Sequence, residues 1–116
     1  MSDCIFCKII AGEIPSKMVY QDDDVVAFQD LHPVAPVHVL IVPRRHSGDI
    51  LELAGSDAGQ DDMVAVLKAA AQVAEISGVA AGGFRLINNC GQDGGQTIRH
   101  THFHLIGGRP FGEKLL

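Results

Sequence analysis

The chain has 116 residues, of which 47% are hydrophobic, and a formal net charge of −5 at pH 7. This length predicts one domain, spanning residues 1–116, that buries roughly two thirds of the surface its unfolded chain exposes. The hydrophobic content excludes a disordered chain. The negative charge and the lack of a basic stripe argue against a nucleic-acid polymer as partner, because such binding depends on neutralising many phosphates.

The N-terminal segment, Met1–Lys8, has no basic leader followed by a long apolar run, and no apolar stretch of the chain reaches bilayer length. We therefore expect a cytoplasmic protein with no membrane partner. Three cysteines in that compartment do not suggest a disulfide framework. Cys4 and Cys7 instead have the spacing of one half of a tetrahedral zinc site. A redox Cys-x-x-Cys motif is the alternative, but it expects a βαβ setting that this N-terminus lacks.

Alternation patterns and chain breakers divide the rest of the sequence into short elements. In chain order we expect a helix over 3–10, strands over 18–21, 25–29 and 38–42, a short helix over 50–54, a long helix from 57 to 76 capped by Ser56 or Asp57, and strands over 84–88 and 98–106. Strands that cluster before and after one long helix predict an α+β fold. The expected architecture is an antiparallel sheet packed with one long helix and a short N-terminal helix.

The long helix has more apolar surface than one sheet face needs. The residues expected to face the core are Met63, Val66, Leu67, Ala70, Val73 and Ala74. Two further apolar residues, Val64 and Ala71, widen this stripe. The pattern indicates either a wide core stripe or self-association, and we expect a homodimer.

Half of the six histidines, namely His100, His102 and His104, occupy every second position of the apolar segment 100–106. In a strand, alternate residues share one face, so the three imidazoles would lie together while the residues between them enter the core. A solvated sheet face on which histidine is incidental is the simpler alternative. An imidazole that is neutral near pH 7 can attack, ligate a metal or move protons.

A glycine-rich loop, 89–96, closely precedes the histidine segment. Its amides and the side chains of Asn89, Gln96 and Thr97 are expected to point toward the imidazoles, as in an anion-binding loop, although many such loops are only turns. The loop lacks a Gly-Lys-Ser/Thr ending and leads into a strand, so it is neither a Walker loop nor a dinucleotide fingerprint. Beside three histidines it indicates attack on phosphorus, because a neutral nitrogen meets less repulsion from phosphate oxygens than an anion does.

The His-x-His-x-His string followed by two apolar residues, and preceded by 94–97, resembles the histidine triad (HIT) family of nucleotide-binding proteins. Similar segments extend over nearly the whole chain, at 4–10, 28–30, 36–38, 42–46 and 107–109. The resemblance implies a HIT-like fold, a purine nucleotide as the small-molecule ligand, and a homodimer. His104 at the last triad position is similar to the hydrolase-like branches, whereas uridylyltransferase-type relatives carry glutamine there.

The resemblance also implies roles for individual residues. His102 would be the nucleophile, supported by His100 and His38. The residues that would contact the phosphate or assist the leaving group are His104, Thr97, Gln96 and Asn89, with Gly95 of the same loop. Asp30 matches the family's acidic residue that accepts hydrogen bonds from the ribose, although a carboxylate capping a turn is the simpler interpretation. Phe6, Phe28 and Leu31 match the residues that wall the base, or they are ordinary core.

His46 and His100 match ligand positions in the zinc-containing subset of this family. The candidate ligands of a structural zinc ion are therefore Cys4, Cys7, His46 and His100. A competing arrangement puts the metal on His100, His102 and His104 and leaves a position open for water. We prefer the first because it uses the cysteines.

The expected function is hydrolysis of a purine nucleoside phosphoramidate, or a similar derivative of AMP, through a nucleotidyl-histidine. Hydrolysis of dinucleoside polyphosphates is the enzymatic alternative. A non-enzymatic nucleotide-binding module that regulates a partner protein is the alternative from another class.

Overall fold

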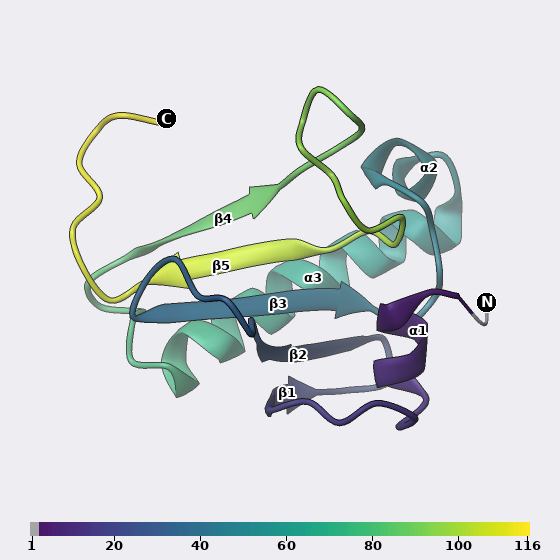
Figure 1. Ribbon diagram of the computed structural model, residues 1–116, viewed down its shortest axis with the longest axis horizontal. Helices are drawn as coiled ribbons and strands as arrows, with labels where there is room; N and C mark the ends of the chain where they lie inside the picture. Colours follow the sequence, from purple (N-terminus) through teal and green to yellow (C-terminus); the bar gives the residue numbers. More distant parts are fainter. Residues whose placement is uncertain (1–2) are drawn as a thin grey trace.

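A computed structural model describes residues 3–116, in which five antiparallel strands form a single sheet with helices on both faces (Figure 1). The elements are α1 (Ile5–Ile10), β1 (Met18–Gln21), β2 (Val25–Gln29), β3 (Val37–Pro43), α2 (Ile50–Ala54), α3 (Asp57–Ile76), β4 (Phe84–Asn88) and β5 (Phe103–Gly107). The strand order across the sheet is β1-β2-β3-β5-β4. This architecture confirms the predicted α+β fold, with one long helix and a short N-terminal helix.

The main hydrophobic core lies between α3 and one face of the sheet (Figure 1). Alternate residues of the central strands point into it, among them Ile41 of β3 and Leu105 of β5, which are fully buried. The helix contributes small side chains such as Ala69 and Val73, so its axis lies close to the sheet. Burying one Leu or Ile side chain of this kind stabilises the fold by about 1.5–3 kcal/mol.

A second, smaller core lies on the opposite face, where α1 covers only one end of the sheet (Figure 1). Phe6 of α1 packs there against Phe28 of β2, with the ring centroids 5.8 Å apart. Leu40 and Val42 of β3 complete this cluster. The rest of this face carries His38 of β3 and His104 of β5, which alternate with the residues that point into the main core.

The strand expected over residues 98–106 is shorter than predicted, because β5 begins only at Phe103. Its neighbours pair with it no further than that residue, through Ile41 of β3 and Asn88 of β4. Before Phe103 the chain is held by Ser47 instead, whose carbonyl accepts the Thr101 N–H at 2.8 Å. The segment that carries His100 and His102 therefore bends out of the sheet, and only His104 lies in a strand.

The long helix begins and ends where the sequence predicted. The Ser56 side chain caps it by accepting the Gly59 N–H at 3.0 Å. The predicted core stripe is right at the four buried positions Val66, Ala70, Val73 and Ala74. It is wrong at Leu67, which is 56% exposed, because α3 meets only one sheet face and the buried stripe is correspondingly narrow.

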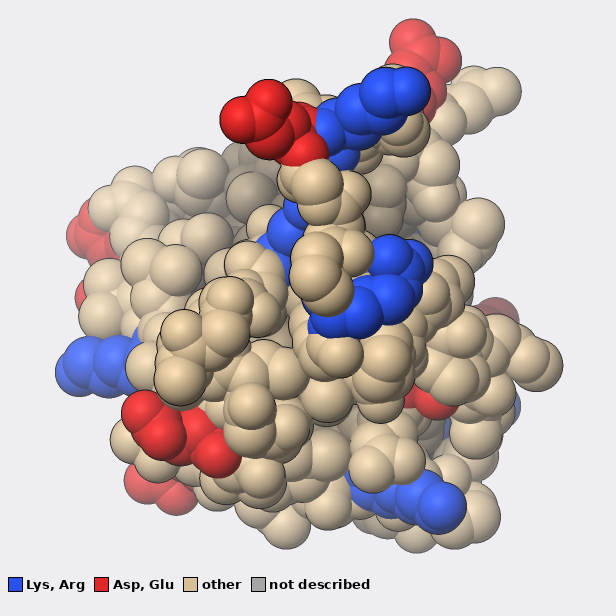
Figure 2. Space-filling view, turned by 90° about the vertical axis from the view of Figure 1, so that its left-hand side faces the viewer, with Lys and Arg blue, Asp and Glu red and all other residues tan. Residues whose placement is uncertain are grey.

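The surface carries mixed charges. On the side shown in Figure 2, basic and acidic side chains are interspersed among uncharged residues. Between residues 3 and 116, no helix is long and apolar enough to cross a membrane. The absence of nucleic-acid and membrane partners stays a prediction.

Candidate active site and metal centre

A cavity of about 420 Å³ opens on the face of the sheet that α1 partly covers. Its volume is typical of small-molecule sites. Of the residues predicted to bind nucleotide or act in catalysis, the cavity is lined by Phe6, Phe28, Asp30, Leu31, Asn89, Gly95, Thr97, His102 and His104. A larger cavity of about 500 Å³, near the ends of β1 and α3, is lined by neither His102 nor His104. The smaller cavity is therefore the candidate active site.

His102 is held rigidly at the wall of this cavity. Its Nδ1 lies 2.8 Å from the His100 carbonyl oxygen, and its ring packs edge-on against Phe6 with the centroids 4.9 Å apart. A carbonyl oxygen only accepts hydrogen bonds, so Nδ1 carries the hydrogen and Nε2 carries a lone pair. Burial lowers the pKa of His102 below the ordinary imidazole value, although the hydrogen bond to the His100 carbonyl opposes this. The lowered pKa favours a neutral ring with a lone pair at Nε2.

His104 follows two residues later, with its ring centroid 5.3 Å from that of His102. Burial is the main cause that lowers the pKa of His104, and the neighbouring His102 and His38 rings add to it. Behind His104, away from the cavity lining, His38 of β3 places its Nε2 2.9 Å from His104 Nδ1. Of the two cavity histidines, His38 therefore contacts His104, and its catalytic support stays a prediction.

Asp30 lies at the rim of the cavity, in the loop between β2 and β3. One of its oxygens, Oδ1, accepts the His32 N–H at 2.7 Å, so the carboxylate does cap a turn. The other oxygen, Oδ2, lies 3.4 Å from His38 Nε2. Asp30 can cap the turn and also bind a ribose, because its carboxylate lines the cavity and can accept further hydrogen bonds there.

The glycine-rich loop is held mainly by bonds within itself. Gly95 has a φ of 80°, which favours glycine, and its N–H donates to the Gln92 carbonyl. The Gln96 side chain is hydrogen-bonded to the backbone at both ends of its amide. Its Oε1 accepts the Gly91 N–H, and its Nε2 donates to the carbonyls of Gly48 and Ile98. Gln96 is not among the residues that line the cavity, and its side-chain hydrogen bonds shape the loop. Its phosphate contact stays a prediction.

The other predicted loop residues do reach the cavity. Asn89 lines it, and its Nδ2 donates to the Gly94 carbonyl at 2.7 Å, which leaves its Oδ1 free to accept a hydrogen bond. Thr97 is exposed at the same wall. Asn89 and Thr97 are therefore the loop side chains placed to contact a ligand beside His102.

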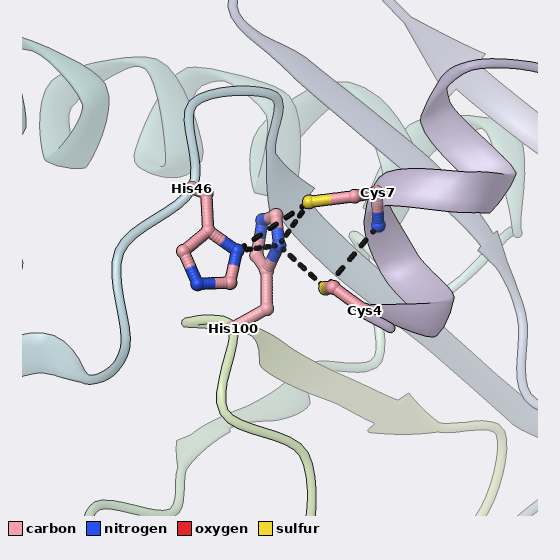
Figure 3. A group of neighbouring side chains, drawn as sticks. All are labelled: Cys4, Cys7, His46 and His100. Carbon is pink, nitrogen blue, oxygen red and sulfur yellow. Dashed lines mark hydrogen bonds between the residues drawn. The ribbon is translucent and has the colours of Figure 1, made fainter. Parts of the chain in front are cut away.

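Cys4, Cys7, His46 and His100 converge at the end of α1 (Figure 3). Figure 3 shows both thiols on α1 or its cap, His46 after β3, and His100 before β5, all directed at one point. Their donor atoms lie within 4.8 Å of one another. The individual separations are 3.3 Å from Cys4 Sγ to His100 Nδ1, 3.4 Å from Cys7 Sγ to His46 Nδ1, and 3.2 Å between the two Nδ1 atoms.

These four residues fit a tetrahedral zinc ion. Zinc bonds of about 2.0–2.1 Å to nitrogen and about 2.3 Å to sulfur place neighbouring ligands about 3.3–3.8 Å apart, which is close to the separations found here. His100 Nε2 donates to the Pro43 carbonyl at 2.7 Å, so its Nδ1 lone pair faces the cluster. Among the described residues, no group that could hold a metal combines His100 with His102 and His104. The geometry therefore favours the cysteine-containing arrangement.

Two backbone carbonyls fix the rings of His100 and His102, and the sequence did not point to either. Those of Pro43 and His100 each accept one ring N–H and so set the tautomer. Every residue has a carbonyl, so the residue types carry no signal for this role. Apolar walls from Ile5, Ile9, Ile14 and Ile98 were also missed, because they are indistinguishable from core residues in sequence.

Comparisons with known proteins identify the family of the chain. Residues 11–111 match the HIT domain family. The chain belongs to the HIT domain family. It is 46% identical over 116 residues to the purine nucleoside phosphoramidase of Escherichia coli strain K12, covering 97% of this chain and 93% of that protein.

Two solved HIT structures are similar throughout. A HIT family hydrolase from Clostridium thermocellum is 45% identical with a TM-score of 0.95, covering 100% of this chain and 99% of the other. A histidine triad protein from Clostridium difficile is 44% identical with a TM-score of 0.92, covering 98% and 97%. The HIT fold predicted from the histidine motif is thereby confirmed.

Proposed function

We propose that this HIT protein is a nucleotide hydrolase that cleaves a purine nucleoside phosphoramidate, or a similar derivative of AMP, through a covalent nucleotidyl-histidine at His102. The observation that carries the proposal is the His102 ring, which has its Nδ1 hydrogen tied to a carbonyl and its Nε2 lone pair free. The similarity to a purine nucleoside phosphoramidase supports this substrate class.

The reaction has two displacements at phosphorus. In the first, His102 Nε2 forms a bond to phosphorus while the bond from phosphorus to the amine nitrogen breaks, and the amine takes up a proton from solvent. In the second, water attacks phosphorus and releases a proton to solvent, the bond to Nε2 breaks, and nucleoside monophosphate leaves as neutral His102 is restored. The His100 carbonyl stabilises the positive charge that the substituted ring carries between the two steps.

The neighbouring residues take roles that follow from their places around the cavity. His104 assists the leaving group, and Asn89 and Thr97 contact the phosphate from the loop side. Asp30 accepts hydrogen bonds from the ribose hydroxyls at the rim. Phe6, Phe28 and Leu31 wall the base, and Leu31, which is 87% exposed, covers it from outside.

His102→Ala tests the nucleophile. We expect turnover of an adenosine phosphoramidate to fall by at least about 10³-fold, because no other group in the cavity replaces the lone pair. Binding of AMP, measured by calorimetry, should change little, and the circular dichroism spectrum should be retained. Hydrolysis by the variant at the wild-type rate would refute the covalent route.

The same assay separates the alternative functions. Wild-type protein is given the phosphoramidate and, separately, a diadenosine polyphosphate, and the products are identified by chromatography. Faster release of AMP from the phosphoramidate supports the proposal, whereas a preference for the polyphosphate would favour the other hydrolase. Binding of AMP without turnover of either substrate would favour a regulatory module.

We further propose that Cys4, Cys7, His46 and His100 hold a structural zinc ion. Four protein ligands leave no position for water, so the ion would cross-link α1 to the segment that follows β3 and to the segment that precedes β5 without entering the chemistry. His100 would connect the two sites, since its ring faces the cluster while its carbonyl holds His102.

Cys4→Ser tests the zinc site. We expect the purified variant to lose its zinc by elemental analysis and to melt roughly 5–10 °C lower, because metal binding is coupled to folding. Cys90→Ser is the matched control, since Cys90 is a free thiol outside the cluster and its loss should change neither quantity. Full zinc content in Cys4→Ser would remove this assignment.

A further inference from the structure

The His38 ring is hydrogen-bonded at both nitrogens although it lies behind the active site. Its Nδ1 is 3.1 Å from the backbone nitrogen of Val34, and its Nε2 is 2.9 Å from His104 Nδ1. The residue is 8% exposed, so water has little access to replace either partner. Both bonds therefore constrain where the ring carries its hydrogen.

The chemistry of these partners leaves one arrangement for a neutral pair. A backbone N–H only donates, so His38 Nδ1 must offer a lone pair to Val34. The hydrogen of His38 is then on Nε2, which faces two acceptors, His104 Nδ1 at 2.9 Å and Asp30 Oδ2 at 3.4 Å. The shorter contact makes His104 Nδ1 the main acceptor. It follows that His104 accepts at Nδ1 and carries its own hydrogen on Nε2, the nitrogen left for the cavity that His104 lines.

We propose that the backbone amide of Val34 is a positioning group that fixes the tautomer of His104 through His38, so that His104 presents an N–H and not a lone pair to the substrate. The effect on catalysis rests on the proposed function, whereas the tautomers themselves do not depend on it. A leaving nitrogen and a phosphate oxygen each accept hydrogen bonds, so an N–H of His104 would stabilise them, whereas a lone pair at the same nitrogen would repel both.

The same hydrogen argues against a second metal centre. Donor atoms of Asp30, His38 and His104 lie within 4.8 Å of one another, as in a site with two histidines and one carboxylate. A metal would have to bind His38 at Nε2, because Val34 occupies Nδ1. That nitrogen carries a hydrogen and lacks a lone pair, so the group is a hydrogen-bond chain.

The Val34 amide lies in the same loop as Asp30, the residue proposed to accept hydrogen bonds from the ribose. Asp30 is fixed by the His32 N–H on its Oδ1, and its own N–H donates to the His38 carbonyl at 3.0 Å. Pro33 and Pro36 restrict the backbone on either side of Val34. The Val34 side chain is 66% exposed, so the amide, and not the side chain, is the part of this residue that matters.

Replacing the Val34 amide by an ester tests the proposal. Incorporation of the corresponding α-hydroxy acid at position 34 removes the N–H while keeping the side chain, and Val34→Pro removes the same donor genetically. Val34→Ala is the control, because it keeps the N–H. Long-range proton–nitrogen spectra of the imidazoles report which ring nitrogens carry hydrogen, and kinetics with an adenosine phosphoramidate report kcat and KM separately.

In wild type and Val34→Ala, we expect His38 and His104 each to be protonated at Nε2 only. In the ester protein, hydrogen should appear on His38 Nδ1, and kcat should fall about 3- to 10-fold with KM within about twofold, the effect of one lost hydrogen bond. A wild-type His38 protonated at Nδ1, or unchanged tautomers in both donor-deleted proteins, would overturn the proposal. Changed tautomers with unchanged kcat would overturn its catalytic part. Absence of turnover in wild type would instead count against the proposed function, while the spectra would still decide the tautomers.

Discussion

Ring tautomers in this protein are set by backbone groups at single positions. The His100 carbonyl leaves His102 with a lone pair at Nε2, and the Pro43 carbonyl leaves His100 with a lone pair at Nδ1. His100 therefore keeps its Nδ1 lone pair for the cluster with Cys4, Cys7 and His46, whereas His102, two residues later, keeps its Nε2 lone pair. Spacing in the sequence gathers the imidazoles, but the hydrogen bonds decide which atom of each can react.

Burial of His104 predicts a pH dependence of stability. Its pKa is lowered in the folded protein, mainly by desolvation, so as pH falls below about 6.5 the unfolded chain takes up this proton first. The free energy of unfolding contributed by this residue is therefore complete above pH 6.5 and decreases as the solution is acidified. We expect the melting temperature to fall between pH 7.5 and 5.

The matched variant is His104→Gln, which cannot titrate in this range. Its melting temperature should vary less with pH than that of wild type, when both are measured by calorimetry with the same metal content. Identical pH profiles for the two proteins would show that His104 does not have a lowered pKa.

At the scale of elements, the sequence predicted most boundaries because local signals and packing agree. β1, β2, β4 and both later helices have the expected limits, and Ser56 is the expected cap. The predicted start of β5 was wrong because pairing with β3 and β4 ends at Phe103 and the Ser47 carbonyl accepts the Thr101 N–H instead. No local pattern encodes such long-range hydrogen bonds.

The sequence predicted which residues gather at the candidate site, but not which atoms they contact there. The four candidate metal ligands lie together as expected: spacing indicated Cys4 and Cys7, and the resemblance to zinc-containing HIT proteins indicated His46 and His100. The backbone contacts of Gln96 could not be foreseen, because an amide is equally able to bind phosphate or backbone. The Val34 amide had no signal in the sequence beyond the prolines around it.

The contact between α2 and α3 depends on the absence of a side chain at Gly59. A Cβ there would overlap the Leu53 carbonyl oxygen, which is backbone and cannot move aside easily. We expect Gly59→Ala to destabilise the fold by about 1–3 kcal/mol despite the better helix propensity of alanine. The midpoint of urea unfolding measures this.

Gly55→Ala is the control for that substitution. Gly55 ends α2 with an ordinary right-handed φ of −79°, and a Cβ there would only touch carbonyl oxygens at 3.4 and 3.5 Å. Its unfolding midpoint should stay close to that of wild type. Equal destabilisation by the two changes would mean that close packing at Gly59 is not the cause.

For the whole molecule, the exposed face of α3 supports the prediction of a homodimer. Val64 is 53% exposed and Leu67 is 56% exposed, and both line an apolar groove with Leu53 and Met63. Burying such a face against a second copy would remove it from water. We expect Leu67→Glu to convert a dimer into a monomer by light scattering, because a charge buried in that contact has no partner.

Leu51→Glu is the matched control for dimerisation. Leu51 is 74% exposed on the neighbouring α2 but does not line the groove, so its charge should leave the assembly intact. An unchanged mass of Leu67→Glu in solution would contradict a dimer built on this groove.

The central claim is that His102 Nε2 carries the nucleotidyl group during turnover. Mixing the enzyme with excess adenosine phosphoramidate, quenching within milliseconds and digesting the chain allows the adduct to be located by mass spectrometry. We predict an adenylyl group on the peptide that contains His102, formed before steady-state release of AMP and absent from His102→Ala. Release of AMP with no adduct at any time, or an adduct on another residue, would contradict the account.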